Sequence, residues 1–318
     1  MTIMIQRHLF FVPVVMATVL ISPEVSAWDP IQDALTTTAK FNMNFRLRYE
    51  GVDDASPLLE DAEALTLRSR LTYESGAYQG FTVGMELDDV TNPMSEEHYN
   101  DGVNGQTSYS GITDPEGTEV NQAWINYAGI PATNIKLGRQ RIVLDSERFI
   151  GSVAFRQNEQ TYDAISVTNK SLPKTTLYYA NINNVNRVFG EENKTQGDHE
   201  TDTHVFNAKY EGFPGLTLST YAYLMDYVDS NKATWGFSNN TYGVRLTGKH
   251  GFGDETLKYA LEYATQSDGY DNPVDYSADY FLGEIGGGNA AVAATLGDEV
   301  LGAEDGATTI ATGATTTK

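Results

Sequence analysis

The amino-acid sequence predicts an all-β protein, a transmembrane antiparallel up-and-down β-barrel. Three observations lead to this prediction: strict alternation of apolar and polar residues, connections that alternate between short and long, and an N-terminal export signal. The alternation is clearest in the segment KFNMNFRLRYE at 40–50. Every odd-numbered residue from Phe41 to Tyr49 is apolar, and every even-numbered residue from Lys40 to Glu50 is polar. A period of two indicates a β-strand with one apolar and one polar face.

The same pattern recurs along the chain and predicts about twelve strands. Four further segments alternate cleanly, at 65–74, 81–88, 242–247 and 257–264. Less regular candidates lie at 119–128, 134–142, 161–169, 175–183, 203–210, 216–227 and 279–285, with a thirteenth candidate near 290–301. Strands of this length suit the roughly 9–11 residues that a tilted strand needs to cross a bilayer. No segment after the first 27 residues shows a helical period.

Short connections alternate with long ones along the predicted sheet. The short ones are rich in Gly and Pro and cover 76–80, 129–133, 170–174, 212–215 and 250–254. The long ones cover 51–62, 90–118, 143–160, 184–202, 228–238 and 267–278. In a transmembrane barrel, tight turns face the periplasm and long loops face outward. A secreted β-sandwich or β-helix could share the alternation but has no reason to segregate loop lengths, so the barrel is favoured.

The first 27 residues predict a secretory signal rather than a membrane anchor. Arg7 and His8 provide a positively charged start. The apolar run Leu9–Ile21 is shorter than the roughly 20 residues of a spanning helix. Val25 and Ala27 place small residues where a signal peptidase cleaves. The mature chain is therefore expected to be exported by the Sec route.

We expect a signal peptide at 1–27 and one outer-membrane barrel domain at 28–318. The stretch 287–318 is atypical, because alternation gives way there to Ala, Gly and Thr, and no terminal aromatic residue follows. An open sheet edge in lipid leaves backbone groups unpaired at several kcal/mol each. We therefore interpret the end of the chain as truncated or altered after about residue 287.

Composition and motifs narrow the function classes. A net charge of −22 argues against a nucleic-acid partner, because no basic excess can displace counterions from phosphates. The absence of cysteine excludes disulfides and Cys-ligated zinc. The Asp-rich segments 53–61 and 267–275 lack EF-hand spacing, and neither a G-x-S-x-G nor an H-E-x-x-H motif occurs. We therefore expect no catalytic residues, metal or cofactor, and a protein that is not an enzyme.

The most distinctive segment of the sequence lies at 135–167 and reads IKLGRQRIVLDSERFIGSVAFRQNEQTYDAISV. Its motifs are LGRQ at 137–140, RFIG at 148–151, RQN at 156–158 and QTYDA at 160–164. With these motifs the chain resembles the alginate export family of Gram-negative outer-membrane barrels, over roughly residues 40–285. The resemblance implies an outer-membrane, porin-like channel, with about eighteen strands in the type member. The closing C-terminal strands of that family have no clear counterpart here.

If the apolar face meets lipid, the polar face lines a lumen. An arginine facing lipid would cost about 2–4 kcal/mol at the bilayer midplane, so arginines on the strands should point inward. The predicted pore-lining, substrate-binding residues are Arg46, Arg48, Arg68, Arg70, Arg139, Arg141, Arg148, Arg156 and Arg245. Arg139 shares its parity with the apolar Ile135 and Leu137, and a bulge at Gly138 would turn it inward.

These features predict an outer-membrane channel for diffusion or export of anionic saccharides such as alginate-like uronates. Arginine-lined pores favour anions, and a guanidinium binds a carboxylate through a two-pronged fork. Two alternatives stay open: the arginines pair with lumenal acids such as Glu50, Glu86 and Glu262, or the lumen is plugged and the barrel is structural. The expected partners are outer-membrane lipid, lipopolysaccharide, the barrel-assembly machinery and an anionic oligo- or polysaccharide.

Overall fold

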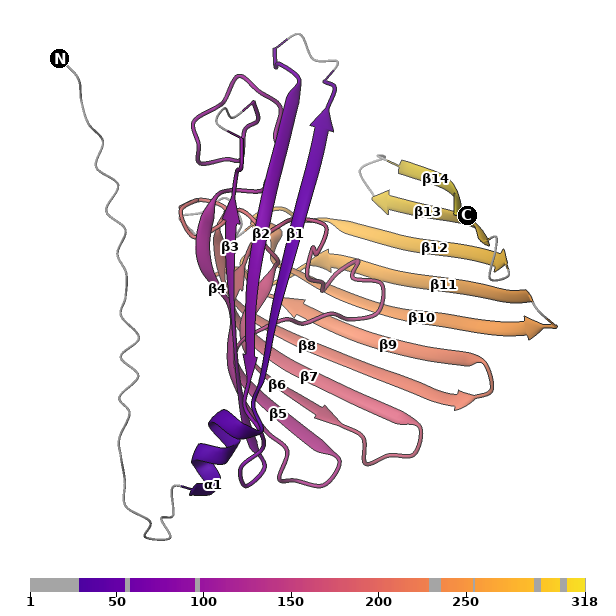
Figure 1. Ribbon diagram of the computed structural model, residues 1–318. Helices are drawn as coiled ribbons and strands as arrows, with labels where there is room; N and C mark the ends of the chain where they lie inside the picture. The colour runs from indigo at the N-terminus through magenta and orange to yellow at the C-terminus, as the bar shows by residue number, and fades with distance from the viewer. Residues whose placement is uncertain are drawn as a thin grey trace.

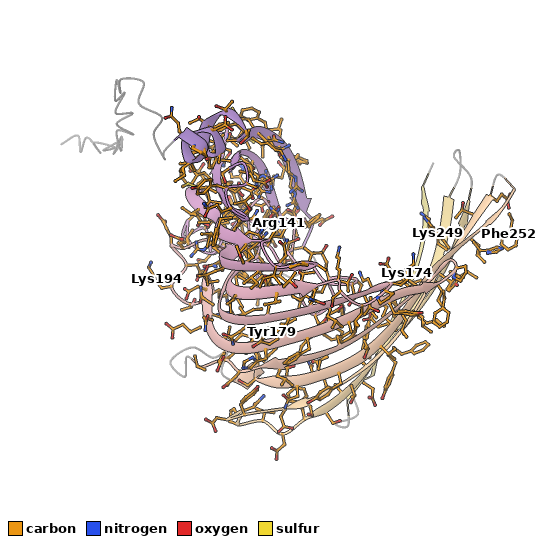
Figure 2. All side chains as sticks on the ribbon, turned by 90° about the horizontal axis from the view of Figure 1, so that it is seen from below. Arg141, Lys174, Tyr179, Lys194, Lys249 and Phe252 are labelled. Carbon is orange, nitrogen blue, oxygen red and sulfur yellow. The ribbon has the colours of Figure 1, made fainter. Side chains whose placement is uncertain are left out.

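The strands form one antiparallel sheet in which each strand pairs with its neighbours in the sequence, from β1 to β14 (Figure 1). The computed structural model describes residues 29–54, 58–94, 98–228, 236–253 and 255–288, and the backbone of 293–303 and 308–317. The predicted signal peptide lies outside these residues. Figure 2 shows the sheet curved into an open trough, with its first strands on one side and its last strands on the other. Within the described part, β1 and β14 do not pair, so the sheet is not closed.

The strand bounds confirm the twelve predicted strands, and the thirteenth candidate is β13. The strands are β1 Lys40–Val52, β2 Ala62–Glu74, β3 Phe81–Thr91, β4 Gly117–Tyr127, β5 Thr133–Gln140, β6 Thr161–Asn169, β7 Thr175–Asn186, β8 Asp198–Phe213, β9 Leu216–Met225, β10 Asn239–Phe252, β11 Glu255–Asp268, β12 Ser277–Gly288, β13 Ala293–Ala303 and β14 Thr308–Thr317. β14 was not predicted, because TTIATGATTT carries almost no apolar alternation. Its backbone nevertheless pairs with β13.

A short helical segment precedes β1, where the sequence predicted none. The α-helix α1, Asp29–Gln32, continues into a π-helical turn, η1, Asp33–Thr37. The Ala34 carbonyl accepts the backbone N–H of Gly76 at 2.7 Å, so this segment covers the turn between β2 and β3. A helical segment of so few residues is too short to show a hydrophobic period in the sequence. Among the described residues, no helix is long and apolar enough to cross a membrane.

The two faces of the sheet differ as the alternation predicts. On β1, the five apolar side chains from Phe41 to Tyr49 are 62–68 % exposed on the outer, convex face. On the inner, concave face, Arg46 and Arg48 are partly buried, because a loop packs against them. An apolar outer face is what a lipid bilayer requires of a spanning sheet.

The main apolar core lies inside the trough. It forms where residues 141–160, the connection between β5 and β6 that we call the inner loop, fold onto the inner face of the sheet. Ile142 and Ile150 of this loop are only 3 % and 4 % exposed. They belong to a cluster with Tyr162, Ala164, Ala180, Ile182, Val205, Tyr221, Tyr223, Ala264, Tyr280 and Leu282. Each large apolar side chain buried in this way contributes about 1.5–3 kcal/mol.

A second loop covers the outer end of the first strands. Residues 92–116, described except for 95–97 and called here the covering loop, connect β3 to β4. Tyr99 and Ile112 of this loop have no exposed surface and pack against Ala62 and Ala64 on β2. The small alanines leave the space that these two larger side chains fill.

Candidate functional site

The inner loop is bound to β1 through arginines that donate to backbone carbonyls. Arg46 Nη1 donates to the carbonyls of Ala154 and Arg156, at 3.0 and 2.9 Å. Arg46 Nη2 donates to the Phe155 carbonyl at 2.8 Å, and Arg48 Nη1 donates to the same carbonyl at 2.8 Å. Val153, just before this segment, has φ = 50°, a strained value for a β-branched residue. The loop is therefore held here in a conformation that it would not adopt alone.

Gln157 attaches the inner loop to β2 as well. Its side chain is fully buried, and Nε2 donates to the carbonyl and hydroxyl oxygens of Thr66, at 3.0 and 2.8 Å. The Gln157 carbonyl accepts a hydrogen bond from Arg68 Nη1 at 3.2 Å. The backbone N–H of Gln157 donates to Asp114 Oδ1 at 2.8 Å. Since Asp114 belongs to the covering loop, both loops and both strands meet at this residue.

Asp114 is a buried carboxylate, 1 % exposed, that also accepts from Arg48 at 3.0 Å. Burial raises the pKa of Asp114, and the hydrogen bond from Gln157 and the charge of Arg48 only partly oppose this effect. Arg48 also contacts Glu50 at 2.6 Å, and Glu50 in turn accepts from Arg156 at 3.0 Å. These contacts pair Arg48 and Arg156 with carboxylates.

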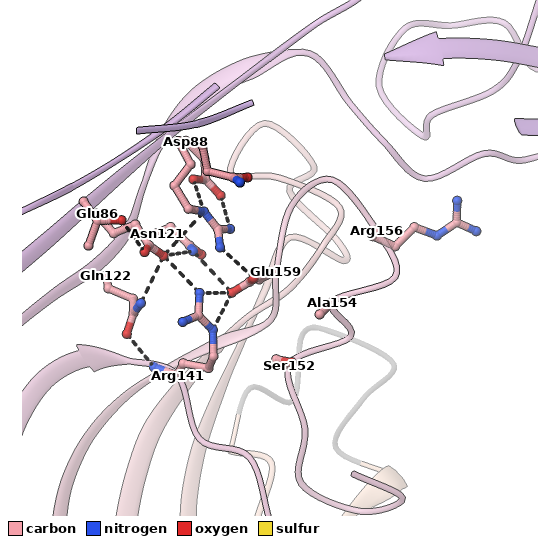
Figure 3. A network of polar contacts seen from close by, with 12 residues as sticks. Glu86, Asp88, Asn121, Gln122, Arg141, Ser152, Ala154, Arg156 and Glu159 are labelled. Carbon is pink, nitrogen blue, oxygen red and sulfur yellow. Dashed lines mark hydrogen bonds and ion pairs between the residues drawn. The ribbon is translucent and has the colours of Figure 1, made fainter. Parts of the chain in front are cut away.

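A network of ion pairs, here called the anchor network, links the base of the inner loop to β2 and β3 (Figure 3). Arg70 on β2 forms a fork with both oxygens of Asp88, at 2.7 and 2.6 Å. Its Nη1 donates to Glu159 of the inner loop at 2.7 Å. Arg141, at the start of the loop, donates from Nε to Glu159 at 2.6 Å and from Nη2 to Glu86 at 3.0 Å. All five side chains are therefore satisfied by each other.

Glu159 titrates below the ordinary range. Burial alone would raise the pKa of Glu159, but the charges and hydrogen bonds of Arg70 and Arg141 outweigh it and lower that pKa. A carboxyl with a depressed folded-state pKa stabilises the fold above its unfolded pKa, and this stabilisation is lost as pH falls through the folded pKa. Glu159 therefore holds the loop at neutral pH and lets it go only in acid.

Acidification should consequently break the Glu159 contacts of the inner loop only below the usual glutamate pKa of about 4.3. We expect the current noise of single channels in planar bilayers to rise in that acidic range. In the Glu159→Gln variant, which lacks the charge at every pH, the noise should already be raised at neutral pH. A wild-type transition near neutral pH, or a quiet Glu159→Gln channel, would contradict this assignment.

The other side of the inner loop rests on aromatic side chains from the later strands. The Phe149 ring contacts Tyr221 and Tyr280, each with centroids 5.7 Å apart, and Tyr223 at 6.2 Å. The three tyrosines are 2–5 % exposed. The Arg148 guanidinium lies over the Tyr280 ring at 5.0 Å. The loop thus spans the trough, from arginines on β1 and β2 to aromatic rings on β9 and β12.

Arg245 on β10 pairs with Glu262 on β11, which is 2 % exposed. Glu262 also accepts from the Tyr221 hydroxyl at 2.7 Å and from the Ser146 hydroxyl of the inner loop at 3.3 Å. Arg245 therefore pairs with a lumenal acid, as expected if the lumenal arginines pair with acids such as Glu262.

Arg139 lies apart from the anchor network. It donates to Asp163 at 3.0 Å, which is its cross-strand neighbour, and to Glu191 at 3.1 Å. The expected bulge at Gly138 is wrong, because β5 pairs residue by residue with β4 and β6. Gly138 instead has φ = 118°, a backbone conformation that side chains rarely allow. Register shifts lie in the adjoining pairings instead: Asn183 of β7 is skipped opposite Asp163 and Ala164 of β6, and Asn121 of β4 is skipped opposite Glu86 and Leu87 of β3.

The predicted pore residues thus fall into distinct environments. Where the inner loop meets the first strands and the covering loop, six arginines lie beside five carboxylates. The arginines are Arg46, Arg48, Arg68, Arg70, Arg141 and Arg156, and the acids are Glu50, Glu86, Asp88, Asp114 and Glu159. Among the described residues, Arg46 and Arg68 donate only to uncharged oxygens. The role of these residues in substrate passage stays a prediction.

Sequence reasoning missed several residues that build the site. Glu159 stands within RQNEQTYDA, but it was not singled out there. Phe149 stands within the motif RFIG but was given no role there, and the tyrosines of β9 and β12 were not singled out as facing the lumen. Arg187, which follows β7, lies outside the regular pattern.

An apolar outer face, an up-and-down antiparallel sheet and a loop folded inside it define a channel of the Gram-negative outer membrane. A family model described as "Alginate export" matches residues 31–297. The chain belongs to the alginate export family. No curated protein matched the chain in a sequence search.

Solved structures share the fold at low identity. OccAB4 of Acinetobacter baumannii is 16% identical with a TM-score of 0.66, and the match covers 84% of this chain and 68% of that one. A BenF-like porin from Pseudomonas fluorescens Pf-5 is 15% identical with a TM-score of 0.65, covering 86% and 69%. OpdK of Pseudomonas aeruginosa, solved with vanillate, is 16% identical with a TM-score of 0.62, covering 86% and 70%. At these identities the likeness is one of fold.

Proposed function

We propose that this channel passes anionic saccharides of the uronate type, by diffusion or export, past the inner loop. The observation that carries the proposal is the environment of Arg46, whose guanidinium donates to three backbone carbonyls and to no carboxylate among the described residues. A carbonyl satisfies the N–H groups without cancelling the charge, so the field of Arg46 extends into the lumen.

Three further points support an anionic substrate. Arg68 likewise donates to the Gln157 carbonyl and the Asn44 side chain, both uncharged. The family description names an anionic polysaccharide, and the OpdK structure holds vanillate, a carboxylate. Arg48, Arg70, Arg141 and Arg156 each contact a carboxylate, whereas the contacts of Arg46 and Arg68 among the described residues leave their charge without an acidic partner.

Arg46→Gln should reduce the anion-to-cation permeability ratio by about two- to fivefold, because a charge roughly 8 Å from a passing ion is worth about 0.5–1 kcal/mol in a wet pore. The matched control is Arg46→Lys, which keeps the charge but has a single nitrogen in place of the two, Nη1 and Nη2, that reach the three carbonyls. It should keep the selectivity while the loop becomes more mobile. Reversal potentials across a salt gradient give the anion-to-cation permeability ratio of the wild type and of both variants. Cation selectivity in the wild type, or equal ratios in all three proteins, would refute the proposal.

The second candidate is a structural barrel with a plugged lumen. Attachment of the inner loop to both sides of the trough favours it. Liposome swelling with neutral sugars of graded size separates the two candidates. A channel admits the smaller sugars and excludes larger ones, whereas a plugged barrel admits none.

A further inference from the structure

Arg187 is a lumenal cation that belongs neither to the predicted pore residues nor to the inner loop. It directly follows β7, at the end of the sheet that carries the long loops. Its neighbour His199 begins an inward-facing row on β8 that continues through the buried Thr201 and Thr203 to Val205 of the apolar core. Arg187 therefore stands at the outer mouth of the lumen, away from the anchor network.

The side-chain partners of Arg187 among the described residues are uncharged. Arg187 Nη1 lies 3.1 Å from His199 Nε2, and since a guanidinium cannot accept a hydrogen bond, His199 Nε2 must be the acceptor. His199 is therefore neutral in this arrangement. The guanidinium also lies over the Phe189 ring at 4.6 Å. No carboxylate among the described residues forms an ion pair with Arg187, in contrast to Arg139 on β5, two strands away from β7.

Arg187 also has donors to spare. A guanidinium has five N–H groups, and one of them is used by His199. None of the other Arg187 nitrogens is among the buried polar atoms of the described residues that lack a hydrogen-bond partner, so solvent reaches them. Burial lowers the pKa of Arg187, with only partial relief from Tyr227, which is consistent with a cation short of negative charge.

We propose that Arg187, flanked by His199 and Tyr227, is an anion-binding subsite that takes a carboxylate of the passing saccharide at the outer mouth. The Tyr227 ring lies 6.0 Å from the His199 ring, so both border the same space. The free edge of the guanidinium fork suits the two oxygens of a carboxylate. The subsite rests on the proposed function and adds a second point of selection, before the inner loop.

The test is block of single-channel current by glucuronate, with the full chain in planar bilayers. Arg187→Gln should raise the half-blocking concentration about tenfold, the effect of losing one charge-assisted hydrogen-bonded contact. Arg187→Lys keeps the charge without the fork, so its half-blocking concentration should lie between those of the wild type and Arg187→Gln. The matched control is Lys194→Gln in the same loop, since Lys194 projects away from the trough (Figure 2) and should leave block unchanged.

The outcomes separate this proposal from the one on which it rests. Block by glucuronate that is equal in wild type, Arg187→Gln and Arg187→Lys would overturn the subsite alone, if the wild type still prefers anions. A wild type that shows neither anion preference nor glucuronate block would overturn both. Block by neutral glucose serves as the reference and should be the same in every variant.

Discussion

Truncating Phe149 to alanine is expected to release the inner loop from the later strands and to widen the channel. The ring rests on three buried tyrosines, Tyr221, Tyr223 and Tyr280. Replacing a packed phenylalanine by alanine costs about 3–5 kcal/mol when the cavity cannot collapse. Because the loop keeps its arginine contacts on β1 and β2, we expect the cost to appear as partial undocking. Single-channel conductance should rise, with more frequent steps between levels.

The control for Phe149 is Phe155→Ala in the same loop. Phe155 is 63 % exposed, and its carbonyl, which accepts from Arg46 and Arg48, remains after truncation. Its ring contributes mainly the contact with the Arg48 guanidinium at 4.0 Å, an interaction of about 0.5–1 kcal/mol. Phe155→Ala should therefore leave conductance close to the wild-type value. Equal conductance in Phe149→Ala and wild type would show that the aromatic contacts do not hold the loop.

Arg70→Met is expected to be the most destabilising single substitution in the anchor network. Among the described residues, the change leaves the buried Asp88 with no cation in contact and leaves Arg141 as the contacting cation of Glu86 and Glu159. Removing one partner of a buried ion pair costs about 3–5 kcal/mol, because the remaining charge stays buried. The midpoint of urea unfolding in detergent should fall accordingly. The excess of acid should also shift selectivity toward cations.

Two further variants identify the cause of the Arg70 effect. Arg156→Met removes an arginine with one carboxylate contact and a more exposed side chain, so its cost should stay below about 1 kcal/mol. Adding Glu159→Gln to Arg70→Met removes one of the acids that have lost Arg70 and should restore part of the lost stability. If Arg70→Met and Arg156→Met unfold at the same urea concentration, the network does not act as a buried unit.

The strands could be predicted wherever one side faces lipid. On β1, the alternation from Phe41 to Tyr49 determined both the strand and the orientation of its arginines, because the membrane tolerates no charge on the outer face. β8 was placed at 203–210 but begins at Asp198, since its first residues are polar on both faces. β14 lacked alternation altogether. Its presence follows from backbone pairing, which no side-chain pattern reports.

The site could be predicted only in part, because inward orientation does not determine partners. The charge and direction of Arg70 followed from its strand, but its partner Glu159 lies 89 residues further along the chain. The carbonyls that accept from Arg46 are set by the path of the inner loop, which local sequence does not specify. For Arg139 the prediction failed in a different way. Its position among apolar residues suggested a bulge at Gly138, but β5 pairs with β4 without one.

A path beside the inner loop that favours anionic saccharides should make itself felt in transport rates. The most direct measurement is flux into liposomes that carry the full chain, comparing glucuronate with glucose, which has the same ring and nearly the same size. We predict faster entry of glucuronate, with the ratio falling as salt screens the arginines. Entry of glucose at an equal or higher rate, or of neither sugar, would contradict the account.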